Sequence, residues 1–238
     1  MNPEWQKIED DVVKAAKILI RRRICEAFGH VSARLPDSDL FVITPSLSMA
    51  MVKAPGDLVK VNLGGERVEG KNRHPYETWL HTCIYRARPD VGAIARTHSF
   101  TTSAFSVAGE PVKPVHDFGA ILLGETPVFA NPHLIDNEQV GTELAQFIGK
   151  GTGALLRGNG TAILGRDVIE AVIRAIYLEE SAMLQWRAKQ MGRPIYFSAE
   201  EINERGTTQS ASAHMQRAWQ HYCWEAGISD AATQDTGR

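Results

Sequence analysis

Residues 84 to 99 read IYRARPDVGAIARTHS and contain, in order, the end of a helix, a proline, a strand and a turn. Apolar residues at Leu80, Ile84 and Ala87 have helical spacing and predict a helix from about residue 76 to residue 88. Pro89 cannot continue that helix, and the run VGAIA that follows is typical of a strand. Helix and strand alternate here, which indicates an α/β fold.

The chain on either side of this stretch continues the alternation. The best-marked helix begins at Asp167, which has the character of an N-cap, with Glu170 three residues later. Helices are expected at residues 3–22, 103–107, 167–190 and 211–226, and strands at 30–35, 40–44, 57–63, 91–95 and on both sides of the Gly-Asn-Gly turn within 152–165. We expect one α/β domain over residues 1–225, followed by a disordered polar tail over 226–238.

The composition excludes several classes of partner. The 238 residues carry 26 lysines and arginines against 28 aspartates and glutamates, without a long run of like charge. Nucleic acid and anionic membrane surfaces, which recruit proteins by bulk charge, are therefore not expected as partners. The sequence has no bilayer-spanning apolar stretch and no signal-peptide pattern, so we expect a cytoplasmic protein. The three cysteines are too widely spaced for a metal motif or a disulfide framework.

Four segments resemble the class II aldolase/adducin family. They are FGHVSARLP with FVITPS, IYRARPDVGAIARTHS with the helix that carries Glu77, LLRGNGTAILG, and the long helix after it, and they run from about residue 8 to residue 192. The resemblance implies a three-layer α/β domain with a central, mostly antiparallel sheet flanked by helices, assembled as a homotetramer with active sites between subunits. It also implies a lyase for a small molecule, in which three histidines hold a divalent metal ion. An acidic residue moves protons in that family, and Glu77 matches it.

Two of the three family histidines are replaced in this chain. The family's HTH turn reads Arg96-Thr97-His98, and its LLRNHG segment reads LLRGNG, with Asn159 at the ligand position. Arginine cannot bind a metal, and asparagine offers only a carbonyl oxygen. The replacements weaken a zinc site and favour manganese, iron(II) or magnesium, or the loss of tight metal binding.

Two hypotheses follow for the catalytic centre. In the first, His98 and Glu77 are joined by His81, which shares a helix face with Glu77, or by His116, and the set rebuilds a metal site. In the second, Arg96 supplies the fixed positive charge that stabilises an enolate or binds a substrate carboxylate. Both hypotheses keep Glu77 as the acid/base, and Glu77, Arg96 and His98 are the candidate catalytic residues.

The segments that contact a sugar phosphate in the family have also changed. His30, Leu47 and Tyr76 replace small polar or glycine residues and predict a more apolar and aromatic pocket. This pattern resembles the family's decarboxylases of hydroxylated aromatic acids. We expect a non-phosphorylated aromatic or keto acid as substrate, and decarboxylation or aldol cleavage as the reaction. The candidate substrate-binding residues are His30, Ser32, Arg34, Ser46, Tyr76, Arg157 and Asn159.

Two other functions are compatible with the sequence. A site with fewer histidines and a carboxylate suits a non-haem iron oxygenase, which would depend on iron(II) and consume oxygen. The loss of two ligands also suits a non-catalytic binding protein, since adducin-like relatives keep the fold without its metal site.

Overall fold

An eight-stranded sheet runs through the centre of the protein in the computed structural model, which describes residues 2–228. The strand order is β4-β3-β2-β1-β5-β8-β7-β6, and within the described residues only the edge pair β6–β7 is parallel. The expectation of a mostly antiparallel sheet is confirmed. The strands are β1 His30–Arg34, β2 Leu40–Ile43, β3 Val59–Asn62, β4 Arg67–Glu69, β5 Ala93–Thr97, β6 Val128–Phe129, β7 Gly153–Leu156 and β8 Thr161–Gly165.

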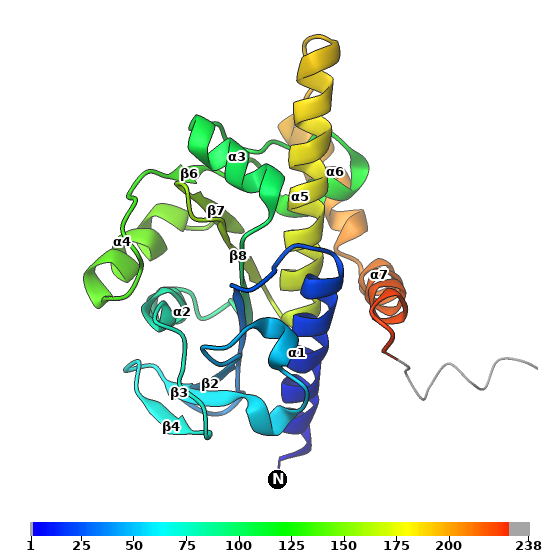
Figure 1. The fold of residues 1–238 in the computed structure, drawn as a ribbon. Helices are drawn as coiled ribbons and strands as arrows, with labels where there is room; N and C mark the ends of the chain where they lie inside the picture. The colour runs from blue at the N-terminus through cyan, green and yellow to red at the C-terminus, as the bar shows by residue number, and fades with distance from the viewer. Residues whose placement is uncertain (1, 229–238) are drawn as a thin grey trace, which may run out of the picture.

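Helices cover both faces of this sheet (Figure 1). One face packs against α1 (Pro3–Arg21) and α5 (Val168–Met191), and the other against α2 (Thr78–Ala87) and α4 (Glu138–Ile148). The remaining helices, α3 (Phe100–Ala108), α6 (Ala199–Gln209) and α7 (Ser212–Glu225), pack around α5 or its neighbours. The three layers implied by the resemblance are therefore present.

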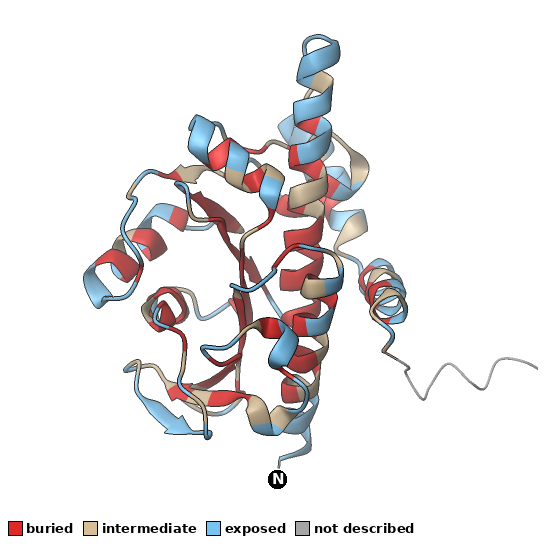
Figure 2. Ribbon diagram, in the orientation of Figure 1, coloured by how far each residue is buried: buried red, intermediate tan, exposed pale blue. Residues whose placement is uncertain are grey.

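The central strand β5 separates two apolar cores. Ala93 and Ala95 belong to the core beside α1 and α5, whereas Ile94 belongs to the core beside α2 and α4. Every residue of β5 is buried, and Figure 2 shows buried residues along the sheet and the facing helices. Because side chains alternate along a strand, Arg96 lies on the same face as Ile94, toward α2. A charged side chain is thus placed inside the protein.

The predicted ends of the long helix are confirmed by its capping contacts. The Asp167 side chain accepts a hydrogen bond from the backbone N–H of Glu170, and α5 ends at Met191, directly before Gly192. The helices α4 and α6 were not predicted. Residues of α6 are mostly polar and include poor helix formers, so tertiary contacts and a capping box at its start hold it instead of an apolar stripe.

Residues 226–228, the first part of the expected tail, belong to the described residues. Ala226 and Ile228 pack against the core beside α1 and α5, so this part of the expected tail is packed against the domain. The remainder of the predicted tail, residues 229–238, lies outside the described residues. No described helix combines the length and apolar character needed to cross a membrane.

Candidate active site

The site lies where β1, β5 and the start of α2 meet. His30 on β1 and Arg96 on β5 are direct cross-strand partners, so their side chains project to the same face of the sheet. Glu77 stands directly before the first turn of α2 and points toward both. The sheet register and the helix start therefore bring together three polar residues that are far apart in the sequence.

A buried ion pair forms the floor of the site. Arg96 is completely buried, and its Nη2 lies 3.1 Å from Glu77 Oε2. Its Nη1 donates a hydrogen bond of 2.9 Å to the carbonyl of Thr97. Gly160 has a positive φ of 77°, and a side chain there would collide with the Thr97 carbonyl and press on the guanidinium. The Gly-Asn-Gly turn thus makes room for the arginine.

His30 and Arg96 together keep Glu77 ionised. Burial by itself would raise the pKa of Glu77, but the His30 ring 3.7 Å away and the positive charge of Arg96 outweigh it, and the pKa falls to about 2. At neutral pH the site therefore contains one carboxylate whose charge is neutralised from behind.

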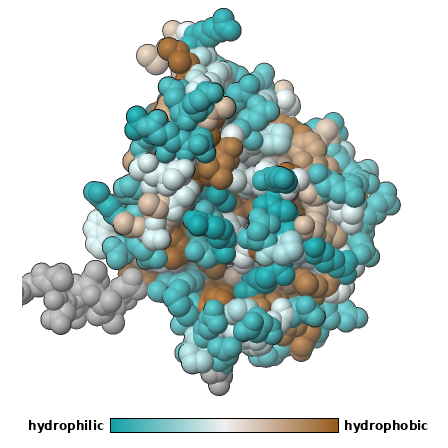
Figure 3. Space-filling view, turned by 180° about the vertical axis from the view of Figure 1, so that it is seen from behind, coloured by the Kyte–Doolittle hydropathy of each residue, from teal (hydrophilic) through white to brown (hydrophobic). Residues whose placement is uncertain are grey.

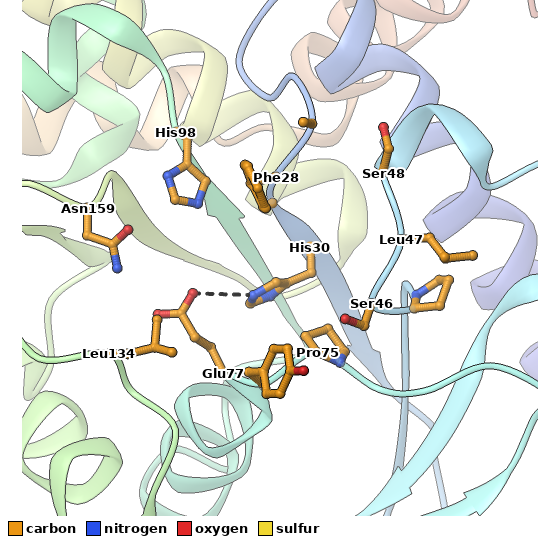
Figure 4. A pocket seen from close by; sticks show the side chains of 14 residues that line it. Phe28, His30, Ser46, Leu47, Ser48, Pro75, Glu77, His98, Leu134 and Asn159 are labelled. Atoms are coloured by element: carbon orange, nitrogen blue, oxygen red, sulfur yellow. Dashed lines mark ion pairs between the residues drawn. The ribbon is translucent and has the colours of Figure 1, made fainter.

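The histidines of the site are neutral at pH 7. Burial and the charge of Arg96 lower the pKa of His98 to about 4. Burial also lowers the pKa of His30, although Glu77 opposes the change. His30, His98 and Asn159 converge with Glu77 around one opening (Figure 4). The opening therefore combines a carboxylate with neutral groups that can donate hydrogen bonds.

These groups line a cavity of about 600 Å³. Its other walls are largely apolar, and among the described residues no lysine or arginine lines it. Phe28 and Tyr76 are both 75 % exposed at its mouth. The remaining lining residues are Ala27, Gly29, Pro45, Ser46, Leu47, Ser48, Pro75 and Leu134. The size and lining suit a small, flat, largely apolar molecule.

The structure places only part of the predicted substrate-binding set at this cavity. His30, Ser46, Tyr76 and Asn159 line it, whereas Ser32, Arg34 and Arg157 do not. Of the arginines expected to bind a substrate carboxylate, neither Arg34 nor Arg157 lines this cavity. Arg34 instead donates to the carbonyls of Tyr85, Arg88 and Val91 at the far end of α2. Arg96 is also absent from the cavity lining, because it lies behind Glu77.

Glu77 and His98 line the cavity, but the other two predicted metal ligands, His81 and His116, do not. His81 is completely buried between His30 and Ser32, and His116 lies elsewhere, with its Nε2 3.0 Å from Ser181 Oγ. Among the described residues, no group of three or more histidine, cysteine or carboxylate side chains is arranged to hold a metal ion. The set of His81, His116, His98 and Glu77 is thus corrected. The donors at the cavity do not fit the metal centre expected from the resemblance, because a guanidinium already neutralises the carboxylate.

Several residues of the site were not identified from the sequence, among them Phe28, Leu134 and Tyr85. Phe28 and Leu134 line the cavity, and Tyr85 lies at the end of a hydrogen-bonded chain behind His30. Tyr85 follows His81 by four residues, as His81 follows Glu77, so helical spacing was a usable signal. Leu134 comes from the loop between β6 and α4 and had no local signal.

Comparisons with known proteins agree with this architecture. The profile of the class II aldolase and adducin N-terminal domain matches residues 10–186. The chain is 26 % identical to decarboxylase tropJ of Talaromyces stipitatus, over 87 % of this chain and 89 % of that protein. It is 26 % identical to 3,4-dihydroxyphthalate decarboxylase of Arthrobacter keyseri, over 88 % and 90 %. It is 29 % identical to L-fuculose phosphate aldolase of Methanocaldococcus jannaschii, over 71 % and 89 %.

A solved structure has the same fold. The aldolase II superfamily protein from Pseudomonas syringae superposes with a TM-score of 0.81 at 20 % identity, over 95 % of this chain and 94 % of that one. The family profile covers most of the chain, and the sheet with its two helical layers matches the fold. This chain therefore belongs to the class II aldolase and adducin family.

Proposed function

We propose that this protein is a carbon–carbon lyase that decarboxylates a hydroxylated, non-phosphorylated aromatic acid, or a keto acid of similar size. Its relatives include two decarboxylases and an aldolase, which supports lyase chemistry of the class II aldolase type. The observation that carries the finer proposal is the lining of the cavity: apolar walls around one ionised carboxylate, without a lining lysine or arginine among the described residues.

This lining favours decarboxylation of an organic acid over cleavage of a sugar phosphate. A cation beside the reacting carboxylate would stabilise the substrate more than the transition state, in which the charge moves from the carboxylate into the ring. A phosphate group, by contrast, is normally held by cations or by several N–H groups. Phe28 and Tyr76 provide apolar surface for an aromatic ring at the mouth of the cavity.

Glu77 acts as the proton carrier in this proposal. Its carboxylate takes the proton from a substrate hydroxyl and returns it to the ring carbon that bears the carboxylate, which gives the keto tautomer. The bond to the carboxylate then breaks, CO₂ leaves, and the electron pair moves to the keto oxygen. That oxygen takes a proton from solvent, so the net reaction consumes one proton and releases CO₂.

Neutral hydrogen-bond donors stabilise the oxygen that gains charge. The His30 ring and the Asn159 amide line the cavity beside Glu77, and His98 lies next to them. Members of the family generally depend on a divalent metal ion, which polarises such an oxygen when it is bound. In this chain, Arg96 instead neutralises Glu77 through a direct contact, and it acts on the substrate only through that carboxylate.

The test is CO₂ release from a panel of hydroxylated benzoates, hydroxylated phthalates and hydroxy keto acids, with sugar phosphates as the comparison. We expect release from at least one aromatic or keto acid, and loss of that activity in Glu77→Gln. His214→Gln, an exposed substitution on α7, is the matched control and should keep full activity. Cleavage of a sugar phosphate without CO₂ release from any acid would contradict the proposal.

We further propose that the protein assembles as a homotetramer in the cytoplasm. Apolar side chains remain exposed along the projecting half of α5, including Trp186 and Met191. Seen from behind, the projecting end at the top of the molecule carries a small apolar group beside hydrophilic atoms (Figure 3). Exposed apolar surface of this kind is typical of a protein interface.

A further inference from the structure

A chain of short contacts leads from Glu77 away from the cavity. His30 Nδ1 lies 2.6 Å from His81 Nε2, and His81 Nδ1 lies 2.6 Å from Ser32 Oγ. Ser32 Oγ lies 2.7 Å from the Tyr85 hydroxyl. The last three residues are buried and do not line the cavity. They can therefore affect a bound substrate only through His30.

This series of contacts forms because the residue spacings along α2 and along β1 are nearly equal. Glu77 at the N-cap of α2, and His81 and Tyr85 within α2, recur every four residues, a rise of about 6 Å per helical step. His30 and Ser32 recur every two residues along β1, a rise of about 7 Å per step. The two series therefore stay in register where helix and strand pack together. Apolar neighbours exclude water from the chain, as Phe41 does beside both His81 and Tyr85.

The carboxylate fixes the direction of the hydrogen bonds. Glu77 is ionised and can only accept, so the nearby Nε2 of the neutral His30 ring carries the proton. His30 Nδ1 must then accept from His81 Nε2–H, which leaves His81 Nδ1 as an acceptor. Ser32 donates to that nitrogen and accepts in turn from the Tyr85 hydroxyl. Every contact in the chain then has one donor and one acceptor.

The opposite direction leaves two groups in poor contacts. With the protons reversed, the His30 Nε2 lone pair would face the Glu77 carboxylate. The Tyr85 hydroxyl would then accept from Ser32, and its own proton would need another acceptor. Among the described residues, Ser32 is the only hydrogen-bond partner of this hydroxyl. A buried donor without an acceptor is costly, so the two ends of the chain select the same direction.

We infer that His81, together with Ser32 and Tyr85, is a positioning residue that locks His30 in the Nε2–H tautomer and aims this N–H at Glu77 and the cavity. The inference rests on the proposed function, in which this N–H stabilises the oxygen that gains charge. A ring with a free tautomer would present a lone pair to that oxygen for part of the time. The buried chain thus prepares the donor before the substrate binds.

The direct test is nitrogen NMR of the protein labelled with ¹⁵N-histidine, without substrate, at pH 7. We expect the His30 and His81 rings to be neutral and both protonated at Nε2. Protonation of His30 at Nδ1 in the wild type would overturn the inference. Because this measurement needs no turnover, it separates a failure of the inference from a failure of the proposed lyase activity.

Two amide substitutions of His81 provide a matched pair. His81→Gln can replace the Nε2–H donor to His30, whereas His81→Asn reaches only the position of Nδ1. We expect the Gln variant to keep the His30 tautomer and most of kcat. The Asn variant should show a mixed tautomer and a fall in kcat of about tenfold or more with little change in KM. Equal behaviour of the two folded variants would contradict the inference.

Ser32→Ala tests the same chain with a smaller change. It removes the donor to His81 Nδ1 and leaves the buried apolar surroundings intact, so it remains informative if the His81 variants do not fold. We expect partial loss of the His30 Nε2–H tautomer and a smaller fall in kcat. An unchanged nitrogen spectrum for His30 would show that its tautomer does not depend on the hydrogen bonds of His81, Ser32 and Tyr85, and would overturn the inference.

Discussion

The ion pair between Arg96 and Glu77 should be strongly coupled. At an N–O distance of 3.1 Å and an effective dielectric constant of about 20, the attraction is about 5 kcal/mol. The fall of the Glu77 pKa from 4.5 to about 2, which corresponds to about 3 kcal/mol, is the net result of burial, which raises it, and of His30 and Arg96, which lower it. Arg96→Met alone leaves the carboxylate buried without its partner and should cost about 3–5 kcal/mol of unfolding free energy.

A double-mutant cycle with Glu77→Gln measures this coupling. The double variant should be less destabilised than the sum of the single variants by about 3 kcal/mol or more in urea denaturation at pH 7. The exposed pair of Arg86 and Glu138 is the matched control, and its cycle should give less than about 1 kcal/mol. A similarly small coupling for the buried pair would refute the reasoning.

The coupling should also depend on pH. The pKa of Glu77 in the folded protein lies below its ordinary value of 4.5, so its stabilising contribution is present above that pH. This contribution should be lost as the pH falls from 4.5 toward 2, because the carboxylate takes up a proton near pH 4.5 in the unfolded protein but only near pH 2 in the folded protein. A coupling energy that is the same at pH 7 and at pH 3 would contradict this account.

Three further predictions concern the metal, the aromatic wall and the assembly. Arg96→His combined with Asn159→His restores two family histidines beside His98. Elemental analysis should find one divalent ion per chain in this double variant and less in the wild type. Equal metal contents would contradict the conclusion that the wild-type side chains do not fit a metal ion. Phe28→Ala should raise KM for an aromatic acid by about tenfold with little change in kcat, since it removes apolar contact surface, and an effect confined to kcat would be evidence against a wall role. Trp186→Glu should lower the mass measured by light scattering from that of a tetramer, whereas an unchanged tetramer would exclude this part of α5 from the interface.

Much of the fold could be predicted from local signals. Apolar spacing and capping residues such as Asp167 and Gly192 located the long helix, because these signals act within a few residues. The helix α6 was missed because a close approach to Ala120, which only a residue like Gly206 permits, helps to hold it in place. Contacts of that kind leave no periodic pattern in the sequence.

The site was predicted less completely than the fold. The spacing of Glu77 and His81 predicted that both lie on one helix face. In the structure Glu77 is the N-cap of α2 and His81 lies one turn further on, inside the protein, because spacing does not specify depth. Arg34 and Arg96 were expected to bind a carboxylate because they are cations near the family motifs. Arg34 instead contacts backbone carbonyls at the end of α2, and Arg96 lies behind Glu77. The positions of Arg34 and Arg96 depend on the pairing of β1 with β5 and on how α2 packs against these strands, which local sequence does not specify.

The central claim is that a buried Arg96–Glu77 pair supports lyase chemistry at a site whose donors do not fit a metal ion. The most direct measurement is CO₂ release from hydroxylated aromatic acids by protein dialysed against a strong chelator, compared with untreated protein and with Glu77→Gln. The account predicts equal activity of the treated and untreated protein, and loss of activity in the variant. Loss of activity on chelation, followed by recovery with an added divalent ion, would contradict it.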